Sequence, residues 1–381
     1  MTSSAQWPAR RKEILEDFER EIYGRVPANA PGVAWEVVST SRGETSGIPT
    51  ITRQLIGRVD NSRYPALSVA IQAGFTIPSS STGPVPLLVA FGGGGLEHAI
   101  PHGWGAGTLN PNSIQADSGG MALRQGVIGL TNLAQPRQPD DWGALRAWAW
   151  GFSRLIDYLE AHPYLGVDAR KIGITGVSRY GKAAIVAQAF DERVAVSLVG
   201  SSGQGGVKLH RHDFGEAVEN LTGGSYYWMA GNYLKYGTEE SSFGRKDAGD
   251  LPVDSHQLIA LCAPRPCFIS YGIESQGDPK WVGATGSYMA GILASPAYQL
   301  MGKTGYGIDP QDYLTAPMPP VNQLAGGELA WRSTTAATPR SRIFRPSSNG
   351  QAGMSVLPIS NKLPLCSHAE YQSLGTVTVS S

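Results

Sequence analysis

The sequence predicts an α/β protein whose mostly parallel central sheet lies between helix layers. Strand-like apolar runs alternate with helix-like runs through most of the chain, which is typical of parallel sheets covered on both faces. Near mid-chain, a serine flanked by glycines lies between a strand-like and a helix-like run. The 48 glycines and 26 prolines supply turns, and a hydrophobic content of 41% is enough for a substantial core.

The first half of the chain is predicted to begin with an amphipathic helix and to continue into strands. Charged and apolar residues alternate at helical spacing over residues 8–24. Strand-like stretches follow at 33–38, 51–59, 66–73, 86–91 and 126–133, and the fourth runs into the glycines 92–95. Residues 140–162 are expected to form a long helix with one apolar face.

The second half repeats the alternation around one long interruption. The expected elements are a strand at 171–175, a helix at 183–190, strands at 194–200 and 267–271, a helix at 283–302 and a strand at 328–332. The polar, aromatic stretch at about 203–254 reads as an insertion above the sheet. We therefore expect one α/β domain over residues 1–332, followed by an atypical tail, 333–381.

The serine turn is typical of a nucleophile elbow. It reads Gly176-Val177-Ser178-Arg179-Tyr180-Gly181-Lys182, and such a turn exposes a hydroxyl while the amides opening the next helix stabilise an oxyanion. The same letters spell Gly-x-x-x-x-Gly-Lys, the phosphate-binding loop of nucleotide-binding proteins. That alternative fails because Ala183 stands where a Ser or Thr hydroxyl must bind magnesium.

Charge and cysteine content exclude several other classes. Lys+Arg and Asp+Glu are equal at 31 each, so no global field attracts nucleic acid or a membrane surface. No apolar run approaches the roughly 20 residues that cross a bilayer, and the N-terminal residues lack a signal peptide's hydrophobic stretch. Cys262, Cys267 and Cys366 match no metal-binding spacing and allow at most one disulfide. We expect no metal and no cofactor.

Four motifs, in order and spacing, resemble the glucuronoyl esterases of carbohydrate esterase family 15. They are the elbow, Phe214-Gly215-Glu216-Ala217-Val218-Glu219, Tyr227-Trp228 and Ala263-Pro264-Arg265-Pro266, and the resemblance covers about residues 8–332. It implies the α/β-hydrolase fold and a secreted or periplasmic enzyme that hydrolyses esters of 4-O-methyl-glucuronic acid in lignin–carbohydrate linkages. The expected substrate is a small or polysaccharide-linked glucuronate ester. The family commonly has a cysteine, disulfide-bonded in some members, where this chain has Val177.

The resemblance and the local chemistry together assign roles to the site residues. Ser178 is the expected nucleophile, with Arg179 as an oxyanion donor and Lys182 as a partner of sugar hydroxyls. Both cations have an alternative role as ion pairs that anchor the elbow. Glu219 and Trp228 match sugar-contacting positions of the family, and Trp281 is a further candidate platform, although aromatic residues more often simply pack.

The acid of the catalytic triad is expected in the loop after the strand 267–271. Some family members carry it about two dozen residues after the nucleophile, but that position is Ser201 here. Glu274 is the better candidate because other members, and α/β-hydrolases generally, place the acid in this later loop. Asp278 is the second candidate, and a solvated loop carboxylate is the alternative for either.

The histidine that should activate Ser178 is missing from its expected place. After Trp331-Arg332 the family pattern is approximately Gln-His-x-Gly-Gly-His-Thr, whereas this chain reads Ser333-Thr334-Thr335-Ala336-Ala337-Thr338. Codons for those six residues, read one base earlier, can encode His-His-Gly-Gly-His. We therefore hypothesise that the reading frame is lost at or near Ser333, with the catalytic histidine at the position now held by Thr338.

The remaining histidines are poor replacements. His98 and His102 follow the glycine run and suit oxyanion-side or structural roles, while His368 lies in the altered tail. Two hypotheses follow: a serine esterase acting on glucuronate esters, or a catalytically impaired carbohydrate-binding homologue that keeps the pocket without the base.

Overall fold

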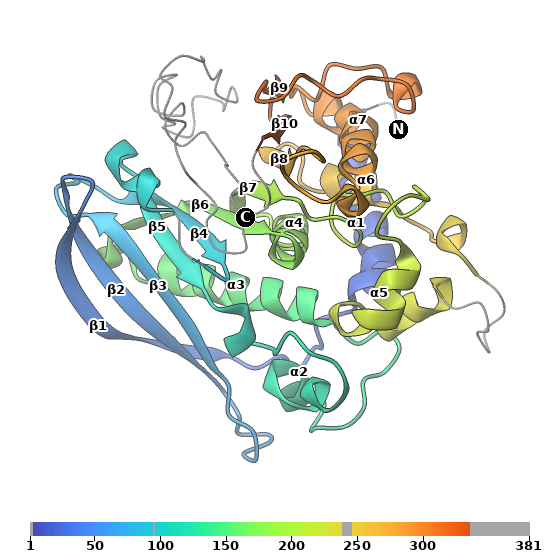
Figure 1. Ribbon diagram of the computed structural model, residues 1–381. Helices are drawn as coiled ribbons and strands as arrows, with labels where there is room; N and C mark the ends of the chain where they lie inside the picture. Colours follow the sequence, from blue (N-terminus) through green and yellow to red (C-terminus); the bar gives the residue numbers. More distant parts are fainter. Residues whose placement is uncertain (1–2, 94–95, 238–245, 336–381) are drawn as a thin grey trace.

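The computed structural model describes residues 3–93, 96–237 and 246–335, whose strands form one mixed sheet (Figure 1). The strand order is β1-β2-β3-β5-β4-β6-β7-β8-β10-β9. The strands are β1 Val33–Thr45, β2 Ile48–Val59, β3 Ala70–Pro78, β4 Val85–Phe91, β5 Gly105–Leu109, β6 Val167–Val177, β7 Val194–Gly200, β8 Cys267–Gly272, β9 Ala325–Gly326 and β10 Leu329–Thr334.

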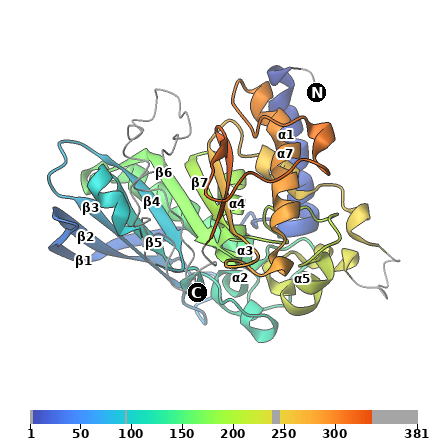
Figure 2. The ribbon, with the colours of Figure 1, turned by 45° about the horizontal axis from the view of Figure 1, so that its top comes forward.

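The middle of the sheet is parallel and its two ends are antiparallel. Strands β5, β4, β6, β7, β8 and β10 run in the same direction, whereas β1, β2 and β3 form an antiparallel meander and β9 pairs antiparallel with β10. Figure 2 shows the meander at one end of the sheet and the C-terminal strands at the other. The predicted mostly parallel sheet is confirmed, and its strands bring their carboxyl ends to one edge, where such sheets bind ligands.

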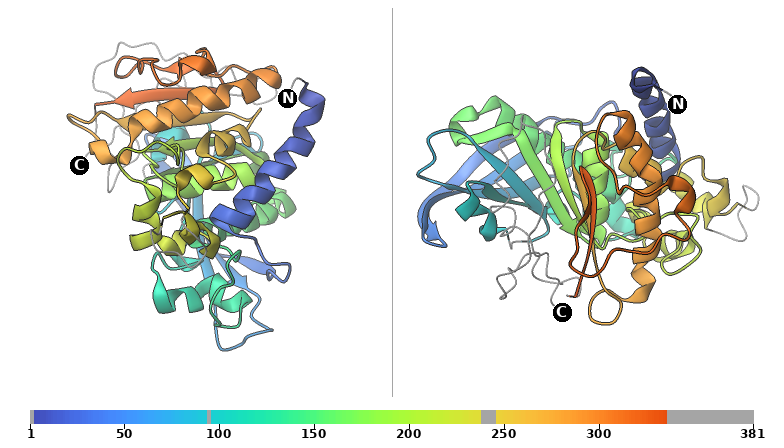
Figure 3. Two further views of the ribbon diagram at one scale, coloured as in Figure 1. Left: turned by 90° about the vertical axis from the view of Figure 1, so that its right-hand side faces the viewer. Right: turned by 90° about the horizontal axis from the view of Figure 1, so that it is seen from above.

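The α-helices of the described residues are α1 Trp7–Phe18, α2 Gly126–Thr131, α3 Ala144–Ala161, α4 Arg179–Phe190, α5 Val218–Gly224, α6 Ser255–Ala260 and α7 Ala284–Leu300. Helices α3, α4 and α7 pack directly on strands of the sheet, and the remaining α-helices pack mainly on other helices and short helical turns. Helices α1 and α7 lie on the same side of the sheet (Figure 3), and Arg11 of α1 donates to the carbonyl of Ala189 at the end of α4 (2.7 Å). The main core lies beneath these helices. A smaller cluster on β4, β8 and β10, including Leu88, Phe268 and Ala330, packs with the 3₁₀ helix Glu97–His102.

One strand prediction is wrong. The run 126–133, expected as a strand, begins with helix α2. A short apolar run fits a buried helix as well as a strand, and here the Gln115 side chain favours the helix because it accepts from the amide of Ile128 (3.1 Å). Strand β5 and the two-residue β9 were not expected; glycine-rich Gly105–Leu109 offers little of the β-branched content that marks a strand.

The insertion consists mainly of short helical turns tied to the core. Asp254 accepts from the amides of His210 and Ser255 (both 2.6 Å), and the Tyr23 hydroxyl donates to the carbonyl of Gly205 (3.1 Å). Cys262 and Cys267 are buried and free, and Cys366 lies outside the described residues. None of the described helices combines the length and apolar character that a membrane crossing requires.

Candidate active site

Ser178 lies exposed at the turn between β6 and α4, in a backbone conformation that strains any residue with a side chain. Its φ is 57° and its ψ is −126°. The flanking glycines are required by close approaches: a Cβ on Gly176 would lie 2.2 Å from the carbonyl oxygen of Tyr180, and one on Gly181 would lie 2.6 Å from that of Gly200. The predicted elbow thus has the sharp geometry that presents a nucleophile.

The amides at the start of α4 form the candidate oxyanion site. The amide of Ser178 donates to the carbonyl of Gly200 (2.9 Å) and is therefore engaged. The next amides, those of Arg179 and Tyr180, are the first of a helix and have no intrahelical acceptor. These donors, at the positive end of the helix dipole, suit an oxygen that gains negative charge beside Ser178.

One carboxylate, that of Asp117, holds three side chains beside the elbow. Arg179 donates from Nη1 to Asp117 Oδ2 (2.5 Å), while Trp228 Nε1 and the Tyr227 hydroxyl donate to Oδ1 (2.7 and 3.1 Å). The Arg179 guanidinium also lies 5.4 Å from the centre of the Trp228 ring. Burial opposes the charge of Arg179, but the Asp117 carboxylate outweighs it and raises the pKa of Arg179. We call these four residues the Asp117 clamp.

Lys182 lies buried behind the clamp, with its ammonium bonded within the protein. Its Nζ donates to the carbonyls of Ser202 (2.6 Å) and Gln204 (2.7 Å) and to Glu216 Oε2 (3.0 Å), and it lies 5.5 Å from the centre of the Trp228 ring. Burial lowers the pKa of Lys182, although Glu216 opposes this effect. All three ammonium donors therefore have protein partners, which connects α4 to the start of the insertion.

The two candidate acids occupy different environments in the loop after β8. Asp278 is buried, accepts from the Ser201 hydroxyl and from the amide of Gly272 (2.7 Å), and has a pKa raised by burial. Glu274 is exposed. Asp278 thus joins the ends of β7 and β8, and Glu274 projects from the loop that Asp278 closes.

Strand β10 ends at the same edge of the sheet. It runs parallel to β8, with Thr334 opposite Gly272, so the chain leaves β10 beside the acid loop. The position of Thr338, where the sequence predicts the lost histidine, lies outside the described residues, as does His368. Among the residues that the structure describes, no histidine is hydrogen-bonded to the Ser178 hydroxyl. His210 is buried against Gln204 and Tyr233, and burial lowers its pKa to about 4.

Comparison with known proteins decides the family. The family described as "Glucuronyl esterase, fungi" matches residues 63–302. The chain belongs to the glucuronoyl esterase family, carbohydrate esterase family 15. A solved glucuronoyl esterase of this family from Teredinibacter turnerae is 37% identical, with a TM-score of 0.79, and the match covers 88% of this chain and 81% of that one.

Two further relatives extend the comparison. A 4-O-methyl-glucuronoyl methylesterase from Hypocrea jecorina is 33% identical over 313 residues, covering 79% of this chain and 60% of its own length. A carbohydrate esterase from an unknown prokaryotic organism is 28% identical over 353 residues, covering 80% of this chain and 76% of its own. The predicted α/β-hydrolase fold and family are confirmed, and the chain is a carboxylic ester hydrolase of the glucuronoyl esterase type.

The structure brings together some of the predicted site residues of this glucuronoyl esterase and leaves others apart. Ser178, Arg179, Lys182 and Trp228 form one connected group around the clamp. Glu219 is exposed in the first turn of α5, and the Trp281 side chain is 56% exposed. The substrate contacts assigned to Lys182, Glu219, Trp228 and Trp281 stay predictions.

Two residues of this site were missed by the sequence analysis. Asp117 lies in a stretch without any motif, so nothing local marks it. Glu216 is inside the family motif 214–219, where its partner Lys182 could have been sought. Within the described ranges, no group of three or more His, Cys, Asp or Glu is placed to hold a metal ion.

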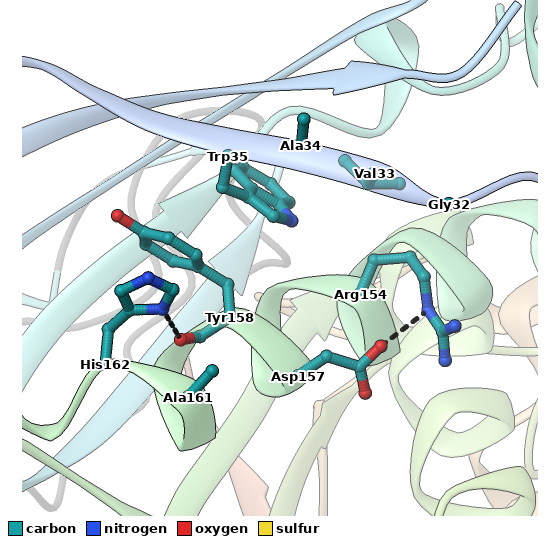
Figure 4. Close-up of a pocket in the computed structure, with 9 residues that line it drawn as sticks. All are labelled: Gly32, Val33, Ala34, Trp35, Arg154, Asp157, Tyr158, Ala161 and His162. Atoms are coloured by element: carbon teal, nitrogen blue, oxygen red, sulfur yellow. Dashed lines mark hydrogen bonds and ion pairs between the residues drawn. The ribbon is translucent and has the colours of Figure 1, made fainter.

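A cavity of about 380 Å³ between the start of β1 and the C-terminal half of α3 is a different site (Figure 4). Its acidic residue, Asp157, is ion-paired with Arg154 (3.1 Å) and Arg193 (2.7 Å). The other half of α3 faces the elbow, because Trp148 packs on Tyr180 with ring centres 5.7 Å apart. The Figure 4 cavity therefore lies at the opposite end of α3 from Ser178.

Proposed function

We propose that Ser178 attacks the ester carbonyl of 4-O-methyl-glucuronate esters, in an acyl transfer that releases the alcohol and then, with water, the acid. The observation that carries the proposal is the strained, exposed Ser178 at the head of α4, beside an arginine that Asp117 holds in place. The attack creates an oxyanion, which the amides opening α4 and the Arg179 guanidinium would stabilise. The proton of Ser178 must pass to a base before or during the attack.

The same proposal makes Glu274 the acid of the triad. Asp278 already accepts from Gly272 and Ser201 and closes the loop, which suits a structural role. Glu274 is exposed on that loop, beside the point where the chain leaves β10, and could orient a histidine arriving from there. Asp278 is the second choice.

The glucuronate moiety is proposed to lie over the clamp and the head of the insertion. Trp228 is buried, at 6% exposed, with the charges of Arg179 and Lys182 against its ring, so it borders the proposed sugar site only through the clamp. The exposed Glu219 and Trp281 offer a hydrogen-bond partner and an aromatic platform. Solved relatives are glucuronoyl esterases, and the Hypocrea jecorina relative is a 4-O-methyl-glucuronoyl methylesterase. A polymer-bound ester of this kind would be met outside the cytoplasm.

The sequence of the tail favours a second candidate for the chain as written: a glucuronate-binding homologue with little turnover. The family's His-x-Gly-Gly-His pattern is absent after β10. Losing a triad member typically costs about 10³-fold or more in rate, leaving a residual from binding and the oxyanion site.

One comparison separates the two. Hydrolysis of methyl and benzyl glucuronate is measured for this chain, for a version whose tail is shifted into the His-x-Gly-Gly-His frame from Ser333, and for that version with Ser178→Ala. We expect turnover in the restored chain alone and glucuronate binding in all three. Silence of the restored chain would reject the esterase proposal, and rapid turnover by the chain as written would reject the frame hypothesis.

A further inference from the structure

A second cavity, of about 610 Å³, lies beside the Asp117 clamp without including any of its residues. Its size is within the range of about 300–1,000 Å³ that small-molecule sites occupy. Two residues that line the cavity are hydrogen-bonded to each other, because the Tyr226 hydroxyl accepts from the amide of Gly120 (2.7 Å). The next two residues, Tyr227 and Trp228, belong to the clamp, so the cavity and the candidate active site share this segment.

The charged residues that line the cavity are all cationic. Arg124, Arg137 and Lys235 line it, and none of its lining residues is an Asp or a Glu. The charge of Lys235 is partly compensated by the carboxylate of Glu21, whose Oε2 lies 3.4 Å from the Lys235 Nζ. Neither arginine has a carboxylate at ion-pair distance among the residues that the structure describes. The lining therefore has a surplus of positive charge that the nearby carboxylates of Glu21 and Asp141 offset only in part.

Arg137 is the strongest indication that an anion belongs here. It is half-buried, and its Nη1 donates only to neutral carbonyls, those of Trp142 (3.0 Å) and Met229 (2.7 Å). Burial lowers its pKa to about 10, with only partial opposition from Asp141. A guanidinium that is removed from water and has no directly paired carboxylate is costly, and a bound carboxylate would remove much of that cost while accepting two parallel hydrogen bonds.

The rest of the lining is largely apolar. Leu123, Leu234, Pro136, Pro139 and the Tyr226 ring contribute to it, and Met121 at the rim is 68% exposed. Methionine side chains adapt to irregular shapes and make favourable contacts with aromatic rings. A small, strongly hydrated anion would gain nothing from these side chains, whereas the apolar body of a larger anion would be buried by them.

We propose that this cavity is a second ligand site that binds an aromatic carboxylate, with its carboxylate at Arg137 and Arg124 and its ring against Leu123, Leu234 and Met121. The site is separate from the ester chemistry and does not depend on the missing histidine.

The test is a titration of the full chain with cinnamate, by calorimetry, at low and high salt. Cinnamamide, which has the same ring and side chain but no charge and no ester, is the matched ligand. Arg124→Gln is the main variant, because the Arg124 side chain makes no hydrogen bond within residues 3–93, 96–237 and 246–335. Arg137→Gln is the second variant, Arg42→Gln in the exposed β1–β2 hairpin is the control, and Arg179→Gln reports binding at the clamp.

We expect one molecule of cinnamate per chain, at least 10-fold weaker binding of cinnamamide, and weaker binding at high salt. Arg124→Gln and Arg137→Gln should each weaken cinnamate binding 5-fold or more. Arg42→Gln and Arg179→Gln should leave the affinity for cinnamate unchanged. Equal binding of cinnamate and cinnamamide would overturn the proposal. So would loss of binding in Arg179→Gln but not in Arg124→Gln, or binding of glucuronate in place of cinnamate.

Discussion

At the scale of single residues, Asp117 is the residue on which the candidate site depends most. It has no chemistry of its own to perform, yet it accepts hydrogen bonds from Arg179, Tyr227 and Trp228. Arginine side chains are flexible, and fixing one beforehand saves the entropy that its ordering would cost in the transition state. We therefore regard Asp117 as a positioning residue for the oxyanion donor and the aromatic face.

Asp117→Asn in the tail-restored chain should lower kcat/KM roughly 10- to 100-fold, less than the roughly 100- to 1,000-fold cost of removing an oxyanion donor outright. The loss should fall mainly on kcat, because Arg179 would remain present but free to move. Asp60→Asn, at an exposed turn after β2, is the matched control. An unchanged kcat in Asp117→Asn would contradict the positioning role.

Substitutions of Glu274 and Asp278 should have different effects, one on activity and the other on stability. Glu274→Gln, on an exposed side chain, should cost about 10³- to 10⁴-fold in kcat for the restored chain with no change in Tm, as expected for the acid of a triad. Asp278→Asn should change Tm, because Asp278 joins β7 to β8, and reduce kcat much less. The reverse pattern would make Asp278 the acid.

At the scale of elements, the turn between β6 and α4 shows what sequence can predict. The glycines and Ser178 specify the elbow locally, because each close approach is made by backbone within a few residues or by the adjacent strand β7. The acid loop, the clamp and the Lys182 network are set instead by long-range packing, with partners such as Asp117 and Arg179 that are 62 residues apart. No local spacing encodes such pairs, so Asp117 was missed while the elbow was predicted.

The strained backbone at Ser178 predicts that a glycine variant is more stable than an alanine variant at this position. Ser178→Gly should be more stable than Ser178→Ala by about 1 kcal/mol, since only glycine adopts a φ of 57° with a ψ of −126° at little cost. Urea unfolding of both variants measures the difference. Equal stability would show that the turn relaxes around a side chain.

Replacing a glycine of the same turn by alanine tests its close approach to strand β7. Gly181→Ala would place a methyl group 2.6 Å from the carbonyl oxygen of Gly200 and should lower the free energy of unfolding by about 1–3 kcal/mol. Gly223→Ala, at a helical position with open space around it, is the control. Comparable losses in both variants would contradict the close approach.

At the scale of the whole molecule, the fold class was predictable because alternating strands and helices leave few architectures. The placement of the insertion was not, because its contacts join Tyr23, Lys182 and Asp254 from distant parts of the chain. This network also buries titratable groups, among them His210 and Lys208. The stability of the molecule therefore depends on pH.

Acid should destabilise the chain through His210. Its folded pKa is about 4 against 6.5 for a free imidazole, because burial and the cations Lys208, Arg211 and Lys182 outweigh Asp254. The unfolded chain therefore binds the proton first, so stability is full at pH 7 and is lost as pH falls from 6.5 toward 4. Lowering the pH from about 7 to 5 should cost about 2 kcal/mol through this residue.

Urea unfolding at several pH values measures this loss. His210→Gln should flatten the pH dependence of the free energy of unfolding over that window, and His162→Gln, at the residue after α3, is the matched control. If the free energy of unfolding of His210→Gln depends on pH as it does in the unchanged chain, the acid sensitivity belongs to other groups.

The conformation of Ser178 also bears on the history of the chain. A residue that costs stability is kept only while its hydroxyl is used, and one change to glycine would remove the cost. A lineage without its catalytic base would have no reason to resist that change. This chain still has the serine, its glycines and the intact Asp117 clamp. A late loss of the C-terminal reading frame would leave these residues in place and remove only the segment that carries the catalytic histidine.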